Sequence, residues 1–65
     1  MIQAKVGDVF ECVNKGLFVF GEVIIFDRYE GDWVVFHRQA KNAEETRVMS
    51  LNYFEYNYLL LKEEE

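Results

Sequence analysis

Cys12 and His37 are the two side chains of this 65-residue chain with the chemistry of a nucleophile or a general base near neutral pH, and each residue type occurs once. We expect Cys12 to be a small buried hydrophobe on a strand, and His37 to be a surface or half-buried strand residue. Four carboxylates fall in one stretch of the chain: Glu22, Asp27, Glu30 and Asp32. Such groups can pair for acid–base catalysis, but we interpret them as solvated turn residues. We therefore expect no catalytic residue and no enzymatic activity.

Cofactor and metal chemistry are not expected either. Cys12 and His37 are the only soft ligands, whereas a closed zinc site needs four. The sequence has no glycine-rich phosphate loop and no serine elbow. A lone cysteine forms no disulfide within the chain and favours a reducing, cytoplasmic location. We expect no signal peptide and no membrane span, because no apolar run approaches the ~20 residues that a spanning helix needs.

The length fits one domain, residues 1–65, whose folding buries only about 60% of the surface of its unfolded chain. The composition compensates with apolar mass: 51% of the residues are hydrophobic, among them six Phe, four Tyr and one Trp. These aromatics are more than so small a core encloses, so we expect some of them at the surface, where they favour contact with a partner. The net charge of −5 argues against loose, non-specific nucleic-acid binding.

Runs rich in β-branched and aromatic residues alternate with glycine turns, which predicts an all-β fold. Phe10 and Cys12 share one face of the first run, and Gly21 predicts a bulge or sharp bend in the second. We expect Gln39–Glu45 to be a loop, and Ser50–Phe54 to be one 3₁₀ turn capped by Ser50. The predicted strands follow one another in meander order: Val6–Val13, Leu17–Arg28, Trp33–Arg38, Thr46–Leu51 and Tyr56–Lys62. Closure into a small five-stranded barrel would remove the exposed edges of such a sheet.

Three short motifs carry a resemblance to a known group. Val6–Val9 resembles the hydrophobic-Gly-Asp-hydrophobic entry of KOW-type barrels, and Gly21–Ile24 resembles their second strand. Ser50–Phe54, followed by Tyr58–Leu61, resembles their helical turn and final strand. Over most of residues 5–62 the chain is therefore similar to the SH3-like small β-barrels of the KOW and Tudor groups, which implies an SH3-like barrel with a binding role. The absence of proline argues against recognition of PxxP peptides, and the length and acidity resemble small accessory proteins of phages and mobile elements.

The leading hypothesis for function is a protein-interaction module. In an SH3-like barrel the loop after the second strand and the final helical turn usually flank one groove. In this chain the predicted groove residues are Tyr29, Glu30, Asp32, Trp33, Tyr53 and Tyr56. Aromatic rings beside carboxylates suit a basic or Arg-bearing peptide, through stacking and paired hydrogen bonds. Phe54 falls in the same segment, but we expect it in the core, whereas Trp33 fits the core and the surface equally well.

Two alternatives and one further possibility stay open. Nucleic-acid binding of the KOW kind would use the cations after position 27: Arg28, Arg38, Lys41, Arg47 and Lys62. In that hypothesis Arg38 and Arg47 neighbour each other on paired strands. The carboxylate excess suggests instead an acidic mimic of nucleic acid that blocks a DNA- or RNA-handling protein. Independently, an edge strand carrying exposed Phe18, Phe20 or Tyr58 would allow a homodimer through strand pairing across a two-fold axis.

Overall fold

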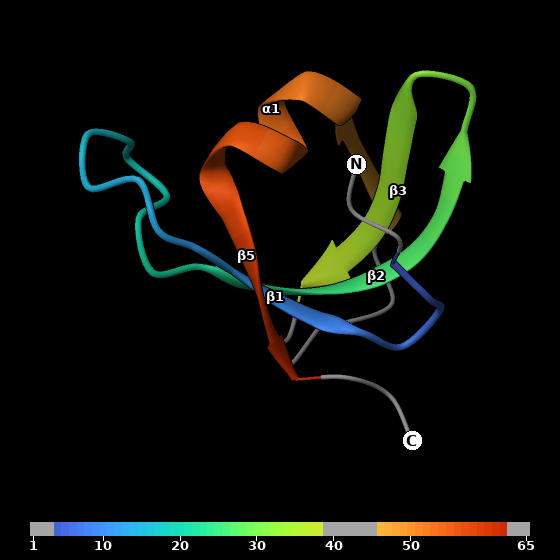
Figure 1. The fold of residues 1–65 in the computed structure, drawn as a ribbon, viewed down its shortest axis with the longest axis horizontal. Coiled ribbons are helices and arrows are strands. Elements are labelled where there is room, and N and C mark those ends of the chain that lie inside the picture. Colours follow the sequence, from blue (N-terminus) through green and yellow to red (C-terminus); the bar gives the residue numbers. More distant parts are fainter. Residues whose placement is uncertain (1–3, 39–45, 63–65) are drawn as a thin grey trace.

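The computed structural model describes residues 4–38 and 46–62, which form one five-stranded antiparallel sheet and one short α-helix (Figure 1). The elements are β1 (Val9–Cys12), β2 (Val23–Glu30), β3 (Trp33–Arg38), β4 (Thr46–Ser50), α1 (Leu51–Asn57) and β5 (Tyr58–Lys62). The strand order β4-β3-β2-β1-β5 makes the first four strands a meander and returns β5 to the side of β1. The prediction of five antiparallel strands is confirmed. Closure into a barrel is not shown, because β4 and β5 are the two ends of the sheet in the described part of the chain. The predicted loop Gln39–Glu45 lies outside the described residues.

The first strand is shorter than predicted, because its opening residues form a turn. Gly7 has a φ of 94°, a backbone conformation that glycine adopts without a steric penalty. The Asp8 amide donates to the Lys5 carbonyl at 3.0 Å, and the buried Asp8 carboxylate accepts from the Lys5 amide at 2.9 Å. The Gly-Asp pair that carries the resemblance to KOW-type barrels thus has a structural role, which is to set the entry into β1.

The predicted strand Leu17–Arg28 is wrong in its first half. Residues 15–21 form turns, in which the Leu17 amide donates to the Asn14 carbonyl at 3.1 Å and the Glu22 amide donates to the Val19 carbonyl at 2.9 Å. Gly21, with a φ of 87°, ends these turns and does not interrupt a strand. The composition of this segment favours a strand, but the turns let Leu17 and Val19 pack against the core, and this packing outweighs the strand preference.

The bend of β2 lies further along the chain than predicted. The register with β3 shifts between Phe26 and Arg28, which marks a β-bulge or irregularity there. Before this point β2 pairs with β1, in the register Val9↔Ile25, and beyond it only β3 pairs with β2, in the register Glu30↔Trp33. The first part of β2 therefore lies between β1 and β3, and its last part pairs with β3. An extra residue bends the strand between these two parts.

The helix before the last strand is longer than the predicted 3₁₀ turn. It is an α-helix of seven residues, and β5 accordingly begins at Tyr58 and not at Tyr56. The predicted cap is confirmed, since the Ser50 Oγ accepts a hydrogen bond from the Tyr53 amide at 3.2 Å. The tyrosines and phenylalanine of this segment have weak helix propensity, and burial of Phe54 against the sheet supplies the stabilisation that propensity lacks.

The core lies between the sheet and α1. Phe54 is fully buried, as expected, with its ring centroid 4.7 Å from that of Phe10 and 6.1 Å from that of Phe26. Phe10 and Cys12 share the buried face of β1, which confirms the predicted pattern. The remaining buried hydrophobic residues are Ile24, Val34, Val35, Phe36, Met49 and Tyr58.

The edge-strand residues predicted for a homodimer are wrong. Phe18 and Phe20 are exposed, but they lie in the turns before β2 and not on a strand. Tyr58 does lie on β5, yet its side chain is buried and faces Cys12 of β1.

Within the described ranges, no helix has the length and apolar character needed to cross a membrane.

Candidate interaction surface

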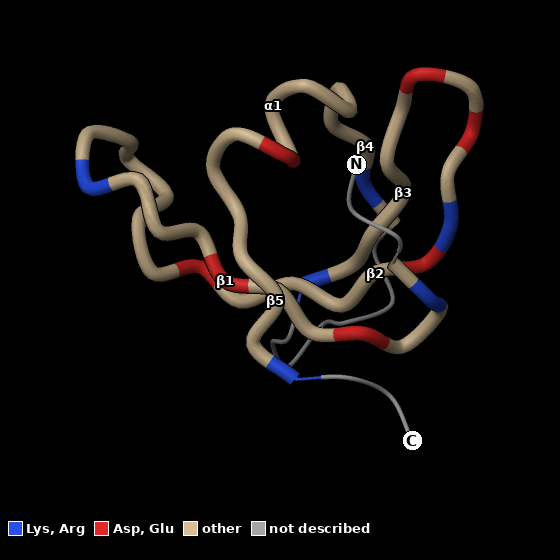
Figure 2. Tube along the Cα trace, viewed as in Figure 1, with Lys and Arg blue, Asp and Glu red and all other residues tan. Residues whose placement is uncertain are grey.

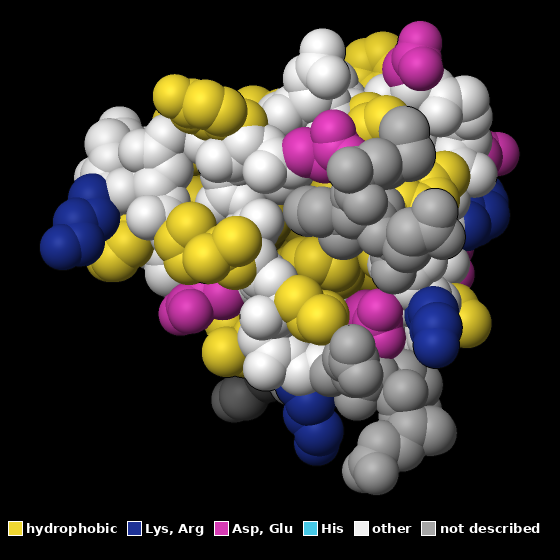
Figure 3. Space-filling model, viewed as in Figure 1, with side chains coloured by type: hydrophobic (Ala, Val, Ile, Leu, Met, Phe, Trp, Pro, Cys, Tyr) yellow, Lys and Arg dark blue, Asp and Glu magenta, His cyan; other side chains and the backbone are white. Residues whose placement is uncertain are grey.

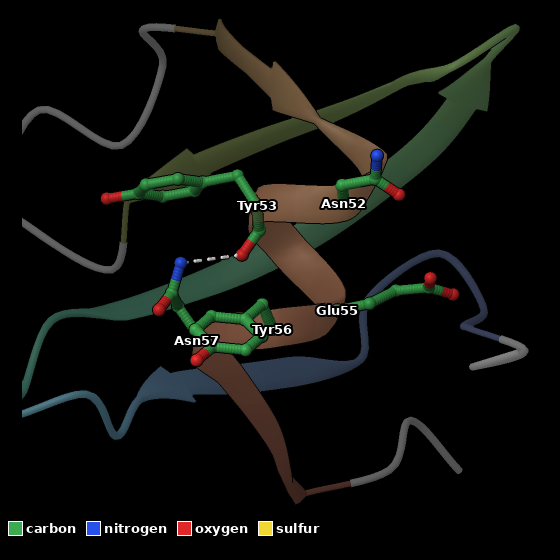
Figure 4. Close-up of a pocket in the computed structure, with 5 residues that line it drawn as sticks. All are labelled: Asn52, Tyr53, Glu55, Tyr56 and Asn57. Atoms are coloured by element: carbon green, nitrogen blue, oxygen red, sulfur yellow. Dashed lines mark hydrogen bonds between the residues drawn. The ribbon is translucent and has the colours of Figure 1, made fainter.

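Two adjoining hollows surround the outer side of α1. The larger, of about 580 Å³, is open to solvent and is lined by Asn52, Tyr53, Glu55, Tyr56 and Asn57 (Figure 4). The smaller, of about 230 Å³, is lined by Asp32, Ser50, Leu51 and Asn52. Asn52 lines both, so the two hollows adjoin at this residue. We call their five outward residues the α1 surface: Asp32, Asn52, Tyr53, Glu55 and Tyr56.

The start of α1 is held against the β2–β3 turn. The Leu51 amide donates to the Asp32 carbonyl at 2.8 Å, which places the turn residue Asp32 beside the first residues of the helix. The Ser50 cap satisfies the Tyr53 amide in the same turn of helix. Two segments that are distant in the sequence thereby meet at fixed positions, and the smaller hollow lies where they meet.

The end of α1 is held by the side chain of Asn57. Its Nδ2 donates to the Tyr53 carbonyl at 2.9 Å, and its Oδ1 accepts from Asn14 Nδ2 at 2.7 Å. Its backbone carbonyl accepts from the Val13 amide at 2.8 Å. Asn57 is a wall of the larger hollow, and these hydrogen bonds fix the helix that carries the tyrosines. The outer face of α1 is therefore presented on a supported element.

Aromatic rings, amides and carboxylates share the α1 surface. Tyr56 is 83% exposed, and Tyr53 is 38% exposed with its ring 6.3 Å from the ring of the buried Tyr58. Figure 4 shows Tyr53 and Asn57 toward one side of the helix, and Asn52 and Glu55 toward the other. An exposed ring beside carboxylate and amide oxygens suits a planar cation, because the ring face and the oxygens recognise different parts of it.

The structure brings together half of the six predicted groove residues. Asp32, Tyr53 and Tyr56 line the two hollows. Tyr29 does not, because its ring packs edge-on against Phe26 with the centroids 4.8 Å apart. Glu30 forms an ion pair with Arg28 at 3.5 Å, and Trp33 is 53% exposed at the start of β3. Neither Glu30 nor Trp33 lines either of these two hollows.

Five lining residues were missed by the sequence reasoning: Ser50, Leu51, Asn52, Glu55 and Asn57. The predicted 3₁₀ turn ended at Phe54, which left Glu55 and Asn57 outside any helix. Residues four positions apart are neighbours on the surface of an α-helix. A helix that begins after the Ser50 cap therefore places Asn52 beside Tyr56 and Asn57 beside Tyr53, and this helical period could have identified Asn52 and Asn57. The shorter turn concealed this pattern.

Lys and Arg are spread over several segments of the described chain and alternate with Asp and Glu (Figure 2). Arg28 pairs with Asp27 and Glu30, and the Arg38 Nε lies 2.8 Å from the Glu22 carboxylate. Arg47 lies opposite Phe36 on β4, one diagonal step from Arg38 in the ladder. Lys41 lies outside the described residues. Arg38 and Arg47 are thus near each other in the sheet as predicted, but Arg38 is already engaged by a carboxylate.

The residues with nucleophile or general-base chemistry do not combine into a site in the described chain. Cys12 is fully buried opposite Tyr58, and His37 is half-buried on β3 opposite Ile25 and Thr46. Residues 4–38 and 46–62 contain no group of three His, Cys, Asp or Glu side chains that could hold a metal ion.

Glu22 joins two elements through its carboxylate. Its Oε1 accepts from the Tyr58 hydroxyl at 3.3 Å, while its Oε2 faces Arg38. Burial raises the pKa of Tyr58 well above its ordinary value, and the nearby negative charge of Glu22 raises it further.

Comparisons with protein-family models, with curated proteins and with solved structures give no match for this chain. Function is therefore inferred from the chemistry of the α1 surface.

Proposed function

We propose that this chain is a non-catalytic protein-interaction module with SH3-like architecture. Three features support the architecture: β5 lies beside β1, β2 is shared by two halves of the sheet, and a short helix directly precedes the last strand. In such small barrels the contact surfaces between elements are the usual route to function, because the interior is filled by side chains.

The ligand that fits best is an arginine-bearing protein segment, and the exposure of Tyr56 is the observation that carries this proposal. An 83% exposed tyrosine next to a second, 38% exposed tyrosine offers ring faces on which a guanidinium stacks. Asp32 and Glu55 supply carboxylates on the same surface, and a carboxylate pairs with arginine through two parallel hydrogen bonds. Tyrosine and arginine are also among the residue types most enriched in strong contributors to binding.

Fluorescence anisotropy with labelled nonapeptides tests the proposal. The peptides carry two arginines at different spacings, and a matched set carries lysine in their place. We expect saturable binding that prefers arginine over lysine, because the planar guanidinium stacks and pairs whereas an ammonium does not. Asp32→Asn and Tyr56→Ala should each weaken binding by about tenfold, the size expected for loss of one charge-assisted hydrogen bond or one stacked ring.

Glu30→Gln is the matched control. It removes one negative charge near Asp32 but outside the hollows, so the affinity should stay within about twofold of the unmodified chain. Equal losses for Glu30→Gln and Asp32→Asn would show a general effect of charge and would contradict a specific surface. If no arginine peptide binds saturably, arginine-bearing segments are ruled out as the ligand.

The two nucleic-acid hypotheses gain less support. Arg28 and Arg38 each face a carboxylate, so binding a phosphate backbone would first require breaking these pairs. The mimic hypothesis needs carboxylates along one face. Among the described acids, Asp8 is buried and Glu22, Asp27 and Glu30 face arginines. Retention of DNA or RNA on a filter at low salt would revive the first alternative.

A further inference from the structure

β5 is an edge strand that exposes three consecutive leucines. It pairs with β1 on one side, and no described strand pairs with its other side. Leu59 is 59% exposed, Leu60 is 44% exposed and Leu61 is 56% exposed. Hydrophobic side chains reach the surface in the region that β5 crosses (Figures 1 and 3). An apolar edge of this kind is a template for pairing with another strand. The register of β5 with β1 shifts between Val9 and Phe10, so Leu61 is an extra residue near the end of β5, whereas Tyr58, Leu59 and Leu60 pair with β1 in regular order.

At Leu60 the backbone hydrogen-bonding groups of β5 point away from β1. The Val13 amide donates to the Asn57 carbonyl, and the register then runs Cys12↔Tyr58, Glu11↔Leu59 and Phe10↔Leu60. Bonded and non-bonded pairs alternate along an antiparallel ladder, so Leu59 bonds toward β1 as Asn57 does. The N–H and C=O of Leu60 therefore face the open edge, where they are ready to bond a new strand.

We propose that β5 pairs with β5 of a second copy, antiparallel and around a two-fold axis that passes beside Leu60. In this register the Leu60 N–H and C=O bond to the same groups of Leu60 of the partner subunit. Leu59 then lies opposite Leu61 of the partner subunit, on the face of the sheet away from Leu60. The two sheets would join into one continuous sheet.

Self-complementarity selects a second copy as the occupant. A strand that covers β5 must be apolar on both of its faces, because the exposed side chains of Leu59 and Leu60 lie on opposite faces. β5 is itself such a strand, and the two-fold axis sets leucine against leucine at each of these positions.

The charge at the end of the chain selects the antiparallel direction. Lys62 is followed in the sequence by Glu63, Glu64 and Glu65. Parallel pairing would set the two acidic ends side by side, whereas antiparallel pairing sends them to opposite ends of the joined strands. This inference does not depend on the proposed function, because the α1 surface contains no residue of β5.

Sedimentation equilibrium of the full chain, from low micromolar to near-millimolar concentration, tests the proposal. We expect the average mass to rise from 7.8 kDa toward twice that value. Leu59→Lys combined with Leu61→Lys should hold the mass at the monomer value throughout, because antiparallel pairing would set the new lysines directly opposite each other. Val48→Lys on β4 is the matched control: Val48 is 58% exposed on the other edge strand, and this variant should associate as the unmodified chain does.

Hydrogen exchange in the unmodified chain gives a second readout that needs no variant to fold. The Leu60 amide should exchange more slowly as the chain concentration rises, whereas the Leu59 amide should show no comparable change. A mass of 7.8 kDa across the whole range would overturn the proposal. So would a dimer that Val48→Lys dissociates and the double leucine change leaves intact, since that result would place the interface on β4.

Discussion

Asn14 and Asn57 lie 43 positions apart in the sequence, and their side-chain amides are joined by a hydrogen bond of 2.7 Å. Asn57 is only 4% exposed and also donates to the Tyr53 carbonyl, while Asn14 Oδ1 accepts from the Gly16 amide at 2.9 Å. This pair ties the loop after β1 to the last residue of α1. The position of the α1 surface therefore depends on a contact between two polar side chains.

Asn57→Leu should destabilise the fold by about 1 to 3 kcal/mol, because it leaves partly buried polar groups of Asn14 and Tyr53 without their present partner. Urea unfolding followed by circular dichroism measures this change. Asn52→Leu is the control on the same helix, since Asn52 is exposed and should change the free energy of unfolding by less than about 0.5 kcal/mol. Similar losses for the two variants would contradict the role assigned to Asn57.

Stability should fall at high pH in a way that depends on Tyr58. Its pKa is raised in the folded chain above the ordinary value of 10.0, so the folded state holds the proton more tightly than the unfolded state does. The stability from this difference is complete below pH 10 and is lost as the pH rises from there toward the raised pKa. Urea midpoints at pH 8 and pH 11 should therefore differ less for Tyr58→Phe than for the unmodified chain. Tyr56→Phe, which removes an exposed hydroxyl, serves as the comparison, and a Tyr58→Phe chain with the unmodified pH dependence would refute the assignment.

Gly21→Ala should cost about 1 to 2 kcal/mol of folding stability. Gly21 has a φ of 87°, and although open space surrounds the position of an added Cβ, an L side chain is strained in that conformation. Gly16→Ala in the same turns is the matched change, because Gly16 does not have a positive φ and meets only the Asn14 side chain at 3.3 Å. Thermal unfolding should separate the two variants, and a smaller effect at Gly21 than at Gly16 would count against the assigned backbone geometry.

Phe18 and Phe54 should respond in opposite ways to truncation. Phe54 is fully buried, so Phe54→Ala should cost about 3 to 5 kcal/mol through lost contacts and the cavity left behind. Phe18 has its side chain in solvent, so Phe18→Ala should shift the free energy of unfolding by less than about 0.5 kcal/mol. Chemical denaturation of the two variants gives both values. A large loss at Phe18 would mean that the loop packs differently from the structure described here.

Local sequence determined the kinds of element and several of their details. The run Trp33–Arg38 is a strand with the predicted bounds, Phe10 and Cys12 share the buried face of β1, and Ser50 caps the helix. These features follow from short-range rules: side chains alternate along a strand, and a serine oxygen accepts from an amide three residues later. Such rules operate within a few residues, so the sequence alone was enough to apply them.

Only the tertiary structure decided where β2 bends, how far α1 extends and which aromatics are inside. Phe10, Phe18, Phe26 and Phe54 have the same side chain, yet Phe18 lies in solvent while the other three pack together. The α1 surface was likewise incomplete in the prediction: Asp32, Tyr53 and Tyr56 were expected there, whereas Asn52 and Glu55 were missed because the predicted turn was shorter than α1. Burial depends on contacts between segments that are distant in the chain, and those contacts are fixed only once the strands have paired in one register.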